Sequence, residues 1–269
     1  MIRQKITYDI SDLEPYINWV YFYFAWQIRD HAEQEKIRKE AEKVLHKLEG
    51  RYHTYALFVV DDANGDGDDI LMGDVRIPML RQQKDTTDGT PNLCLADFIR
   101  PLASGIKDKM GVFATSVDIG METDFCHDDY MKMMVQLLAD RLAEATAERM
   151  HEEVRKTYWG YAPDEHLTMN ELHLETFQGI RPAIGYPSMP DTSVNFIIAD
   201  ILGIKDIGIR LTESGAMKPH ASVCGLMIAH PQAHYFALGK IGEDQLNDYS
   251  RRRGIPIEVM RRFLVSNLR

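Results

Sequence analysis

The stretch "TYALFVVDDANGDGDDILM", residues 54–72, combines a hydrophobic run, a cluster of glycine and aspartate, and a second hydrophobic run. Glycine and aspartate are typical of tight turns between strands, because they tolerate left-handed backbone conformations. The stretch therefore predicts a strand, a turn and a second strand. Strands joined this tightly pair antiparallel, so an antiparallel sheet is the first expectation for the fold.

The same turn resembles the opening of an EF-hand calcium loop through Asp62, Asn64, Asp66 and Gly67. The twelfth position of such a loop is Gly73 here, where calcium binding needs a bidentate glutamate. The flanking residues are also typical of strands rather than helices. We favour an ordinary hairpin turn and expect no metal site.

Helical periodicity predicts two long helices on either side of this hairpin. Residues 31–50 form a charged helix that ends at Gly50, and residues 127–160 form the longest helix, which begins at Asp128 or Asp129 and ends at Gly160. The second helix carries an apolar stripe that we expect in the core. Its members are Tyr130, Met134, Leu137, Leu138, Leu142 and Ala145.

The aromatic segment 15–28 has seven aromatic side chains in fourteen residues, and we interpret it as a buried anchor. Near the other end of the chain, residues 207–212, 222–229 and 235–241 are predicted strands, followed by two short helices. Strands and helices in this order indicate an α+β fold, organised as one domain around an antiparallel sheet.

Composition restricts the partners and the compartment. The chain has 269 residues and a net charge of −10, which argues against a nucleic-acid partner. No apolar run approaches the ~20 residues of a membrane span, and the first residues lack the apolar core of a signal peptide. Three widely spaced cysteines predict neither a disulfide framework nor a zinc site. We expect a cytoplasmic protein with no membrane partner.

Several long motifs, in this order, carry a resemblance to a known family. They are "NWVYFYFAW" (18–26), "LRQQ" (80–83), "NLCLADF" (92–98), "VRKTYWGYAPDE" (154–165), "QGIRPAIGYPSMPD" (178–191) and "AMKPHASVCGLMIAHPQAHYFALGKIGEDQLNDYSRRRG" (216–254). Together they resemble the carboxy-terminal activation domain of cobalamin-dependent methionine synthase, over roughly Tyr16 to Leu268.

The resemblance implies a single helmet-like α+β domain over residues 1–269, with a central antiparallel sheet and long flanking helices. It also implies a domain that binds S-adenosylmethionine and docks onto a cobalamin-binding domain. In this family, inactive cob(II)alamin is rescued by one-electron reduction from a flavodoxin-like donor, coupled to methyl transfer from S-adenosylmethionine. The chain is then a module of a cobalamin-dependent methyltransferase.

Motifs of the other methionine synthase domains are missing from the sequence. There is no zinc-binding cysteine cluster for homocysteine, no folate barrel and no Asp-x-His-x-x-Gly cobalamin motif. We therefore expect the cobalamin to come from a partner domain or a separate protein. The sequence leaves open whether the chain is a stand-alone activation protein or a part of a larger enzyme.

The loop 181–191 is the centre of the site that the resemblance implies. Arg181 can bind the ligand carboxylate through its planar, permanently charged guanidinium group. The extended backbone at Ala183 can hydrogen-bond the adenine edge, and Gly185 allows a close approach. Tyr186 is the candidate catalytic residue, with its ring and hydroxyl near the transferable methyl group. Three prolines hold the loop in one geometry, which lowers the ordering cost of binding.

Four further residues extend this site. By family match, Glu144 and Tyr235 contact S-adenosylmethionine. Asn18 occupies a position where the family usually has an acid, and an amide cannot neutralise the positive charge of the ligand. Asp140, one helical turn before Glu144, is predicted to face the partner and to accept a hydrogen bond from its released cobalt-ligating histidine. A solvated surface role for Asp140 stays open.

Two further positions depart from the family pattern, and two other functions compete with this one. Met189 and Thr192 stand where the family often has cysteine and histidine, at the edge that faces the corrin. A non-catalytic module that senses S-adenosylmethionine or binds a corrinoid protein is the alternative, and Asn18 favours it. An ordinary methyltransferase has less support, because the chain has no glycine-rich strand-to-helix loop of the doubly wound type.

Overall fold

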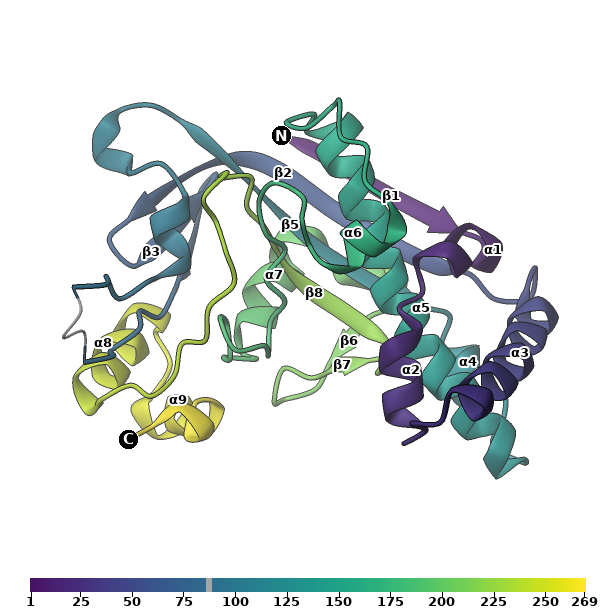
Figure 1. Cartoon of the computed structure of the whole chain (residues 1–269). Helices are drawn as coiled ribbons and strands as arrows, with labels where there is room; N and C mark the ends of the chain where they lie inside the picture. Colours follow the sequence, from purple (N-terminus) through teal and green to yellow (C-terminus); the bar gives the residue numbers. More distant parts are fainter. Residues whose placement is uncertain (86–88) are drawn as a thin grey trace.

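The computed structural model describes residues 1–85 and 89–269, and its centre is a curled antiparallel sheet (Figure 1). The main sheet has the order β4-β3-β2-β5-β8, and β1 also pairs with β2. Its strands are β1 (Ile2–Tyr8), β2 (Thr54–Asp66), β3 (Asp69–Met72), β4 (Val75–Pro78), β5 (Asp108–Val117) and β8 (Ser222–Met227). A separate small sheet pairs β6 (Arg210–Leu211) with β7 (Met217–Lys218).

Helices flank this sheet, and their bounds follow the chain. They are α1 (Ile10–Leu13), α2 (Trp19–Ala25), α3 (His31–Leu48), α4 (Gly120–Thr123), α5 (Asp129–Glu153), α6 (Met169–His173), α7 (Val194–Leu202), α8 (Glu243–Arg253) and α9 (Ile257–Phe263). In Figure 1, α8 and α9 lie at one end of the molecule, while α2 and α3 lie at the other. The predicted α+β fold with a central antiparallel sheet and long flanking helices is confirmed.

The hairpin predicted from residues 54–72 is formed by β2 and β3. Asp66 pairs with Asp69, so the turn consists of Gly67, at φ +61°, and one further residue. Asp62 lies within β2 and forms ion pairs with Lys107 and Lys109 at 2.9 and 3.1 Å. The EF-hand-like pattern is therefore part of an ordinary hairpin, as we favoured from the flanking residues.

Alternate residues of the strands build two cores on opposite faces of the sheet. On β2, Phe58 and Val60 pack against the side that carries α1, α3 and α5. Leu57 and Val59 pack against the side that carries α7. This alternation follows from the two-residue repeat of a strand, and it makes β2 buried on both faces.

Helix α5 begins as the sequence predicts, with the Asp128 side chain accepting a hydrogen bond from the Met131 amide at 3.0 Å. It continues as a wider π-turn over Val154–Tyr158 and ends before Gly160, at φ +72°. Of the predicted stripe, four members are buried, Leu137 is half-buried and Tyr130 is exposed. Tyr130 packs against Trp26 instead, because it lies in the first turn of the helix.

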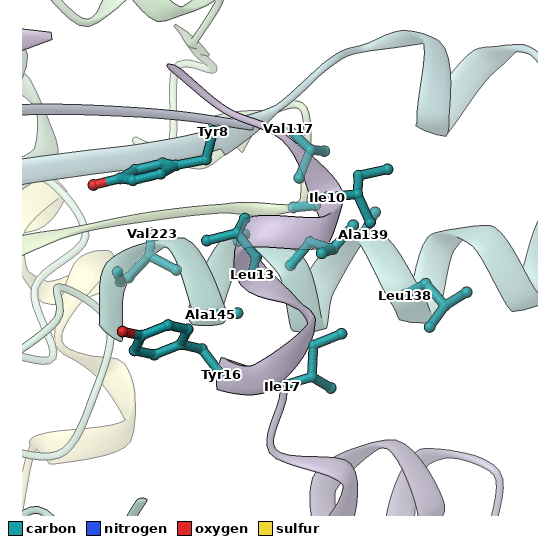
Figure 2. Packing of buried hydrophobic residues seen from close by; sticks show 14 of the residues in the cluster. Tyr8, Ile10, Leu13, Tyr16, Ile17, Val117, Leu138, Ala139, Ala145 and Val223 are labelled. Atoms are coloured by element: carbon teal, nitrogen blue, oxygen red, sulfur yellow. The ribbon is translucent and has the colours of Figure 1, made fainter. Parts of the chain in front are cut away.

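The N-terminal segment packs across α5 (Figure 2). Ile10, Leu13 and Ile17 face the helix, where Leu138 and Ala139 meet them in the same buried cluster. This packing fixes the position of the residues that follow Leu13, including the start of α2. The segment consequently forms one wall of the cavity described below.

Three predictions about individual segments were wrong. Residues 235–241 do not form a strand, and within 207–212 only Arg210–Leu211 is a strand. Residues 180–184 pair antiparallel with the edge of β8. The aromatic segment 15–28 is only partly buried, because Phe22 is in the core whereas Phe24 is 82% exposed. A short helix on the surface of α5 can bury only one of its faces.

Close contact between β8 and residues 180–184 depends on Gly225. A Cβ atom at Gly225 would lie 2.3 Å from the Pro182 carbonyl oxygen, which is backbone and cannot rotate away. We expect Gly225→Ala to destabilise the fold by about 1–3 kcal/mol, the range for overpacking. Urea denaturation measures this, with Gly111→Ala as the control.

In the control, the added Cβ would first meet the terminal methyl of Met227, 2.6 Å away, which is the flexible end of a side chain. Gly111→Ala should therefore cost less than Gly225→Ala. Equal stability of Gly225→Ala and the wild-type protein would contradict the close approach.

Candidate functional site

A cavity of about 620 Å³ lies between α5, the end of the N-terminal segment and the loop that follows β8. Its lining comes from six parts of the chain, residues 16–21, 141–148, 173–175, 181–188 and 235–237 together with Val223 of β8. The volume is in the range of about 300–1,000 Å³ that small-molecule sites occupy. Both acidic and basic side chains line it, so the cavity can receive a ligand that carries charges of both signs.

The loop around Arg181 enters the cavity because its first residues run alongside β8. Ile180 exchanges two backbone hydrogen bonds with Ile228, at 2.9 and 3.0 Å. In this extended segment, side chains alternate, so Ile180 and Ile184 enter the core below while Arg181 and Ala183 line the cavity. Pairing with β8 thus orients the residues that the sequence singled out.

Arg181 is the most deeply placed basic residue of the cavity, only 8% exposed. Its Nη2 donates to the Glu148 carboxylate, and its Nη1 donates to the Ala147 carbonyl at 3.2 Å. Burial by itself lowers the pKa of Arg181, but the charge and hydrogen bond of Glu148, together with the charges of Tyr235 and Glu144, outweigh this effect and raise it. The Nε atom makes no hydrogen bond to any described residue, so part of the guanidinium group is left for a ligand.

Behind Arg181 lies a buried network that sequence reasoning missed. His151 is fully buried, and its Nδ1 lies 2.9 Å from Arg155 Nη1 and 3.4 Å from Arg181 Nη1. Burial and the two arginines lower the pKa of His151 well below its usual value. The ring is therefore neutral, with Nδ1 as the acceptor and Nε2 facing the Tyr161 hydroxyl at 3.4 Å.

Arg155 anchors the far side of this network. Its guanidinium group forms a two-armed ion pair with Glu165, with Nε–Oε2 at 2.9 Å and Nη2–Oε1 at 2.6 Å. It also stacks on the Phe177 ring, 4.1 Å from its centroid. Arg155 and Glu165 both lie in the motif 154–165. They are ten residues apart in the sequence, so no local pattern indicates that they form an ion pair.

Two tyrosines connect the acidic and basic parts of the cavity. The Tyr186 hydroxyl donates to Glu144 Oε1 at 3.1 Å, and the charge of Glu144, together with burial, raises the pKa of Tyr186 to about 12. The Tyr235 hydroxyl accepts from the Arg181 amide at 2.9 Å, and burial raises the pKa of Tyr235 to about 12. Both hydroxyls stay protonated near neutral pH.

Most of the predicted site residues meet in this cavity. Those that line it are Asn18, Glu144, Arg181, Ala183, Tyr186 and Tyr235. Gly185, at φ +90°, lies in the turn between them and is not part of the lining. Asp140 lies one turn before Glu144, half-buried and outside the cavity, where burial raises its pKa.

Two acidic residues of the lining were missed, Glu148 and Glu175. Glu148 follows Glu144 by one helical turn, so the helical repeat could have placed it on the same face. Glu175 has no such signal, because it lies just after a short helix whose position depends on tertiary contacts.

Two general features of the described residues bear on ligands and location. Within residues 1–85 and 89–269, no three His, Cys, Asp or Glu side chains are grouped so that they could hold a metal ion. In the same part of the chain, none of the helices has the length and apolar character needed to cross a bilayer.

Comparisons with known proteins agree with the motifs. Residues 9–254 match the model of a family described as vitamin B12 dependent methionine synthase, activation domain. Among solved structures, the chain is similar to the MetH reactivation domain bound to AdoHcy, with 39% sequence identity and a TM-score of 0.95. That match covers 100% of this chain and 90% of the other. The chain therefore belongs to the activation-domain family of vitamin B12-dependent methionine synthase.

Proposed function

We propose that the cavity binds S-adenosylmethionine and that the chain supports reductive methylation of cob(II)alamin held by a partner domain or protein. The observation that carries the proposal is the buried Arg181, whose guanidinium group is held on one side by Glu148 and is open on the other. The related reactivation domain was solved with AdoHcy, the product that remains when S-adenosylmethionine has lost its methyl group.

The cavity offers a partner for each polar part of this ligand. Arg181 Nε and Nη2 suit the carboxylate, since a planar guanidinium group can bind both carboxylate oxygens. The Ala183 amide makes no hydrogen bond to a described residue and can donate to the adenine edge. Glu144 and Tyr186 are hydrogen-bonded to each other, and we place them near the ribose and the methyl group.

The partner's cobalamin, reduced by an electron from a flavodoxin-like donor, supplies the nucleophile that accepts the methyl group. The residues of this chain hold the methyl donor, S-adenosylmethionine. We assign Tyr186 the catalytic position, because its hydroxyl remains protonated and cannot itself compete for the methyl group as a phenolate. The rigid loop 181–191 keeps S-adenosylmethionine in one geometry, which lowers the entropic cost of reaching the transition state.

Asp140 is the residue that we assign to the partner. It lies on the same helix as Glu144 and outside the cavity. Burial raises its pKa, and the charge of Arg141 acts against this. A carboxylate there can accept a hydrogen bond from a histidine of the cobalamin-binding partner and favour the protonated ring. Such a contact stabilises the docked state of the partner.

Asn18 has a local role that does not depend on the ligand. Its Oδ1 accepts from the Val20 amide at 3.2 Å and caps α2, a position for which asparagine is a preferred residue. Aspartate caps a helix equally well, so this role suits either residue and does not decide between the proposed function and the non-catalytic alternative.

The test uses S-adenosylmethionine labelled in its methyl group. We expect calorimetry to detect one site per chain. Label should pass to cobalamin only when a reconstituted cobalamin-binding partner and a reductant are both present.

Three results would contradict the proposal in different ways. Binding without transfer would select the non-catalytic sensing or corrinoid-binding module. Transfer to a small nucleophile in the absence of the cobalamin protein would select an ordinary methyltransferase. Absence of any binding would exclude the ligand.

A further inference from the structure

His151 is a buried polar residue at which three parts of the chain meet. It lies in the last turn of α5, is fully buried, and is not among the described residues that line the cavity. Its Nδ1 lies 2.9 Å from Arg155 Nη1 and 3.4 Å from Arg181 Nη1, and its Nε2 lies 3.4 Å from the Tyr161 hydroxyl. The ring therefore sits directly behind the arginine that faces the cavity, and the function proposed above assigns it no role.

Each of the two arginines beside His151 has a carboxylate of its own. Arg155 is paired with Glu165, and Arg181 is paired with Glu148. A positive group between the arginines would repel both of them, and a third carboxylate would leave the buried cluster with an excess of negative charge. The position therefore requires an acceptor without charge, and a neutral imidazole with one free lone pair meets this requirement.

The His151 ring is held in one orientation by its other contacts. It meets the Phe177 ring edge to face, with the two centroids 5.0 Å apart. Its Nε2 proton points to the Tyr161 hydroxyl, which in turn donates to the Gln178 carbonyl at 3.4 Å. Gln178 begins the segment that leads into Arg181. The direction of the Nδ1 lone pair is consequently fixed by residues on both sides of the ring.

This lone pair acts on the terminal nitrogen of Arg181 that also contacts α5. Nη1 donates to the Ala147 carbonyl at 3.2 Å and faces His151 Nδ1, while Nη2 donates to Glu148. Because a guanidinium group is planar, contacts at both terminal nitrogens determine the orientation of the whole group. Nε is then the atom left without a partner among the described residues, and its direction depends on how firmly Nη1 is held.

We propose that His151 is a positioning residue for Arg181, and that its Nδ1 lone pair orients the guanidinium group that receives the ligand carboxylate. The inference rests on the proposed binding of S-adenosylmethionine through Arg181 and adds the residue that sets the geometry of this contact. It also connects the motif 154–165 to the cavity, because Arg155 and Tyr161 of that motif both contact His151.

The test compares two amides at position 151 in the full chain. The Oδ1 atom of asparagine is as many bonds from Cα as Nδ1 of histidine, so His151→Asn can restore the acceptor. The amide of His151→Gln lies one bond further out, near the place of Nε2. Asparagine also removes more buried volume, so His151→Asn should have the lower midpoint of urea denaturation.

Affinity should follow the opposite order. His151→Gln should weaken S-adenosylmethionine and S-adenosylhomocysteine by roughly 5- to 30-fold in calorimetry, because a buried charged donor loses one acceptor. His151→Asn should bind both ligands within about threefold of the wild-type chain, since the acceptor is restored. A residue that only filled space would give affinities in the same order as the stabilities.

A ligand without a carboxylate shows whether the effect passes through Arg181. Decarboxylated S-adenosylmethionine should bind the wild-type chain and His151→Gln with equal affinity. His151→Phe repeats the comparison, because it keeps a ring against Phe177 and removes the acceptor. It takes the place of His151→Gln if the glutamine variant does not fold.

Three results would overturn the inference. The first is weaker binding by His151→Asn than by His151→Gln, and the second is wild-type affinity of both His151→Gln and His151→Phe. The third is a loss of the decarboxylated ligand by the same factor as S-adenosylmethionine. If the wild-type chain binds none of these ligands, the proposed function itself fails, and the inference fails with it.

Discussion

Replacement of Arg181 by alanine is expected to destabilise the fold by about 3–5 kcal/mol, as well as to weaken the ligand, because it leaves a buried carboxylate without its partner. The side chains of Arg181 and Glu148 are 7% and 13% exposed, so solvent cannot replace the lost ion pair. The sequence assigned Arg181 only a contact to the ligand carboxylate, the loss of which costs about 1.5–3 kcal/mol of binding for a charge-assisted hydrogen bond.

A double variant separates these two effects. Arg181→Met combined with Glu148→Leu removes both charges and keeps most of the buried volume, so it should regain much of the stability. Binding of S-adenosylmethionine should stay weak in the double variant, because the guanidinium group is gone. Urea denaturation and calorimetry measure the two quantities independently. Full binding by the double variant would exclude a ligand role for Arg181, and a stable single variant would show that the ion pair contributes nothing.

The second large effect is expected at Arg155, which is not among the described residues that line the cavity. Arg155 is fully buried, with a two-armed ion pair to Glu165 and a hydrogen bond to His151. Arg155→Ala should therefore cost about 3–5 kcal/mol, the range for removing one partner of a buried ion pair. The same substitution removes the hydrogen-bond partner of the His151 ring, which also lies beside Arg181. The position of Arg181 should therefore become less well defined.

An exposed pair of the same residue types provides the matched control. Arg261 forms a two-armed ion pair with Glu243, at 2.6 and 2.7 Å, but the two side chains are 38% and 62% exposed. Arg261→Ala should cost no more than about 1 kcal/mol, because solvent replaces the lost contacts. Chemical denaturation of both variants tests the difference. Equal costs would mean that burial is not what makes the Arg155 pair important.

The sequence by itself determined the elements that are stabilised by contacts within a few residues of the chain. The hairpin 54–72 follows from its glycine-aspartate turn, and the start of α5 follows from the cap at Asp128. Both depend on contacts within a few residues, where turn and capping preferences act. The long motifs also indicated the family, which the match over residues 9–254 confirms. The roles of the residues in the loop 181–191 stay a prediction.

Tertiary structure decided which distant segments meet. The edge of β8 could accept any extended segment, and hydrophobicity alone did not distinguish 180–184 from 235–241. Gly225 permits the pairing with 180–184 sterically, since its missing side chain leaves room for the Pro182 carbonyl. Once residues 180–184 take that edge, Arg181 lies beside Glu148 and the cavity is formed.

The charged network behind the cavity depends on the same long-range packing. Buried arginines are stable only when specific acceptors converge on them. Here Glu148 of α5 accepts from Arg181, while His151 of α5 and Glu165 accept from Arg155. The sequence shows that arginines and glutamates are present but not which of them lose their solvent. The sequence by itself therefore determines the local elements and indicates the family. The burial of each charge, and with it the pairing of that charge, arises only when the sheet, α5 and the loop are assembled.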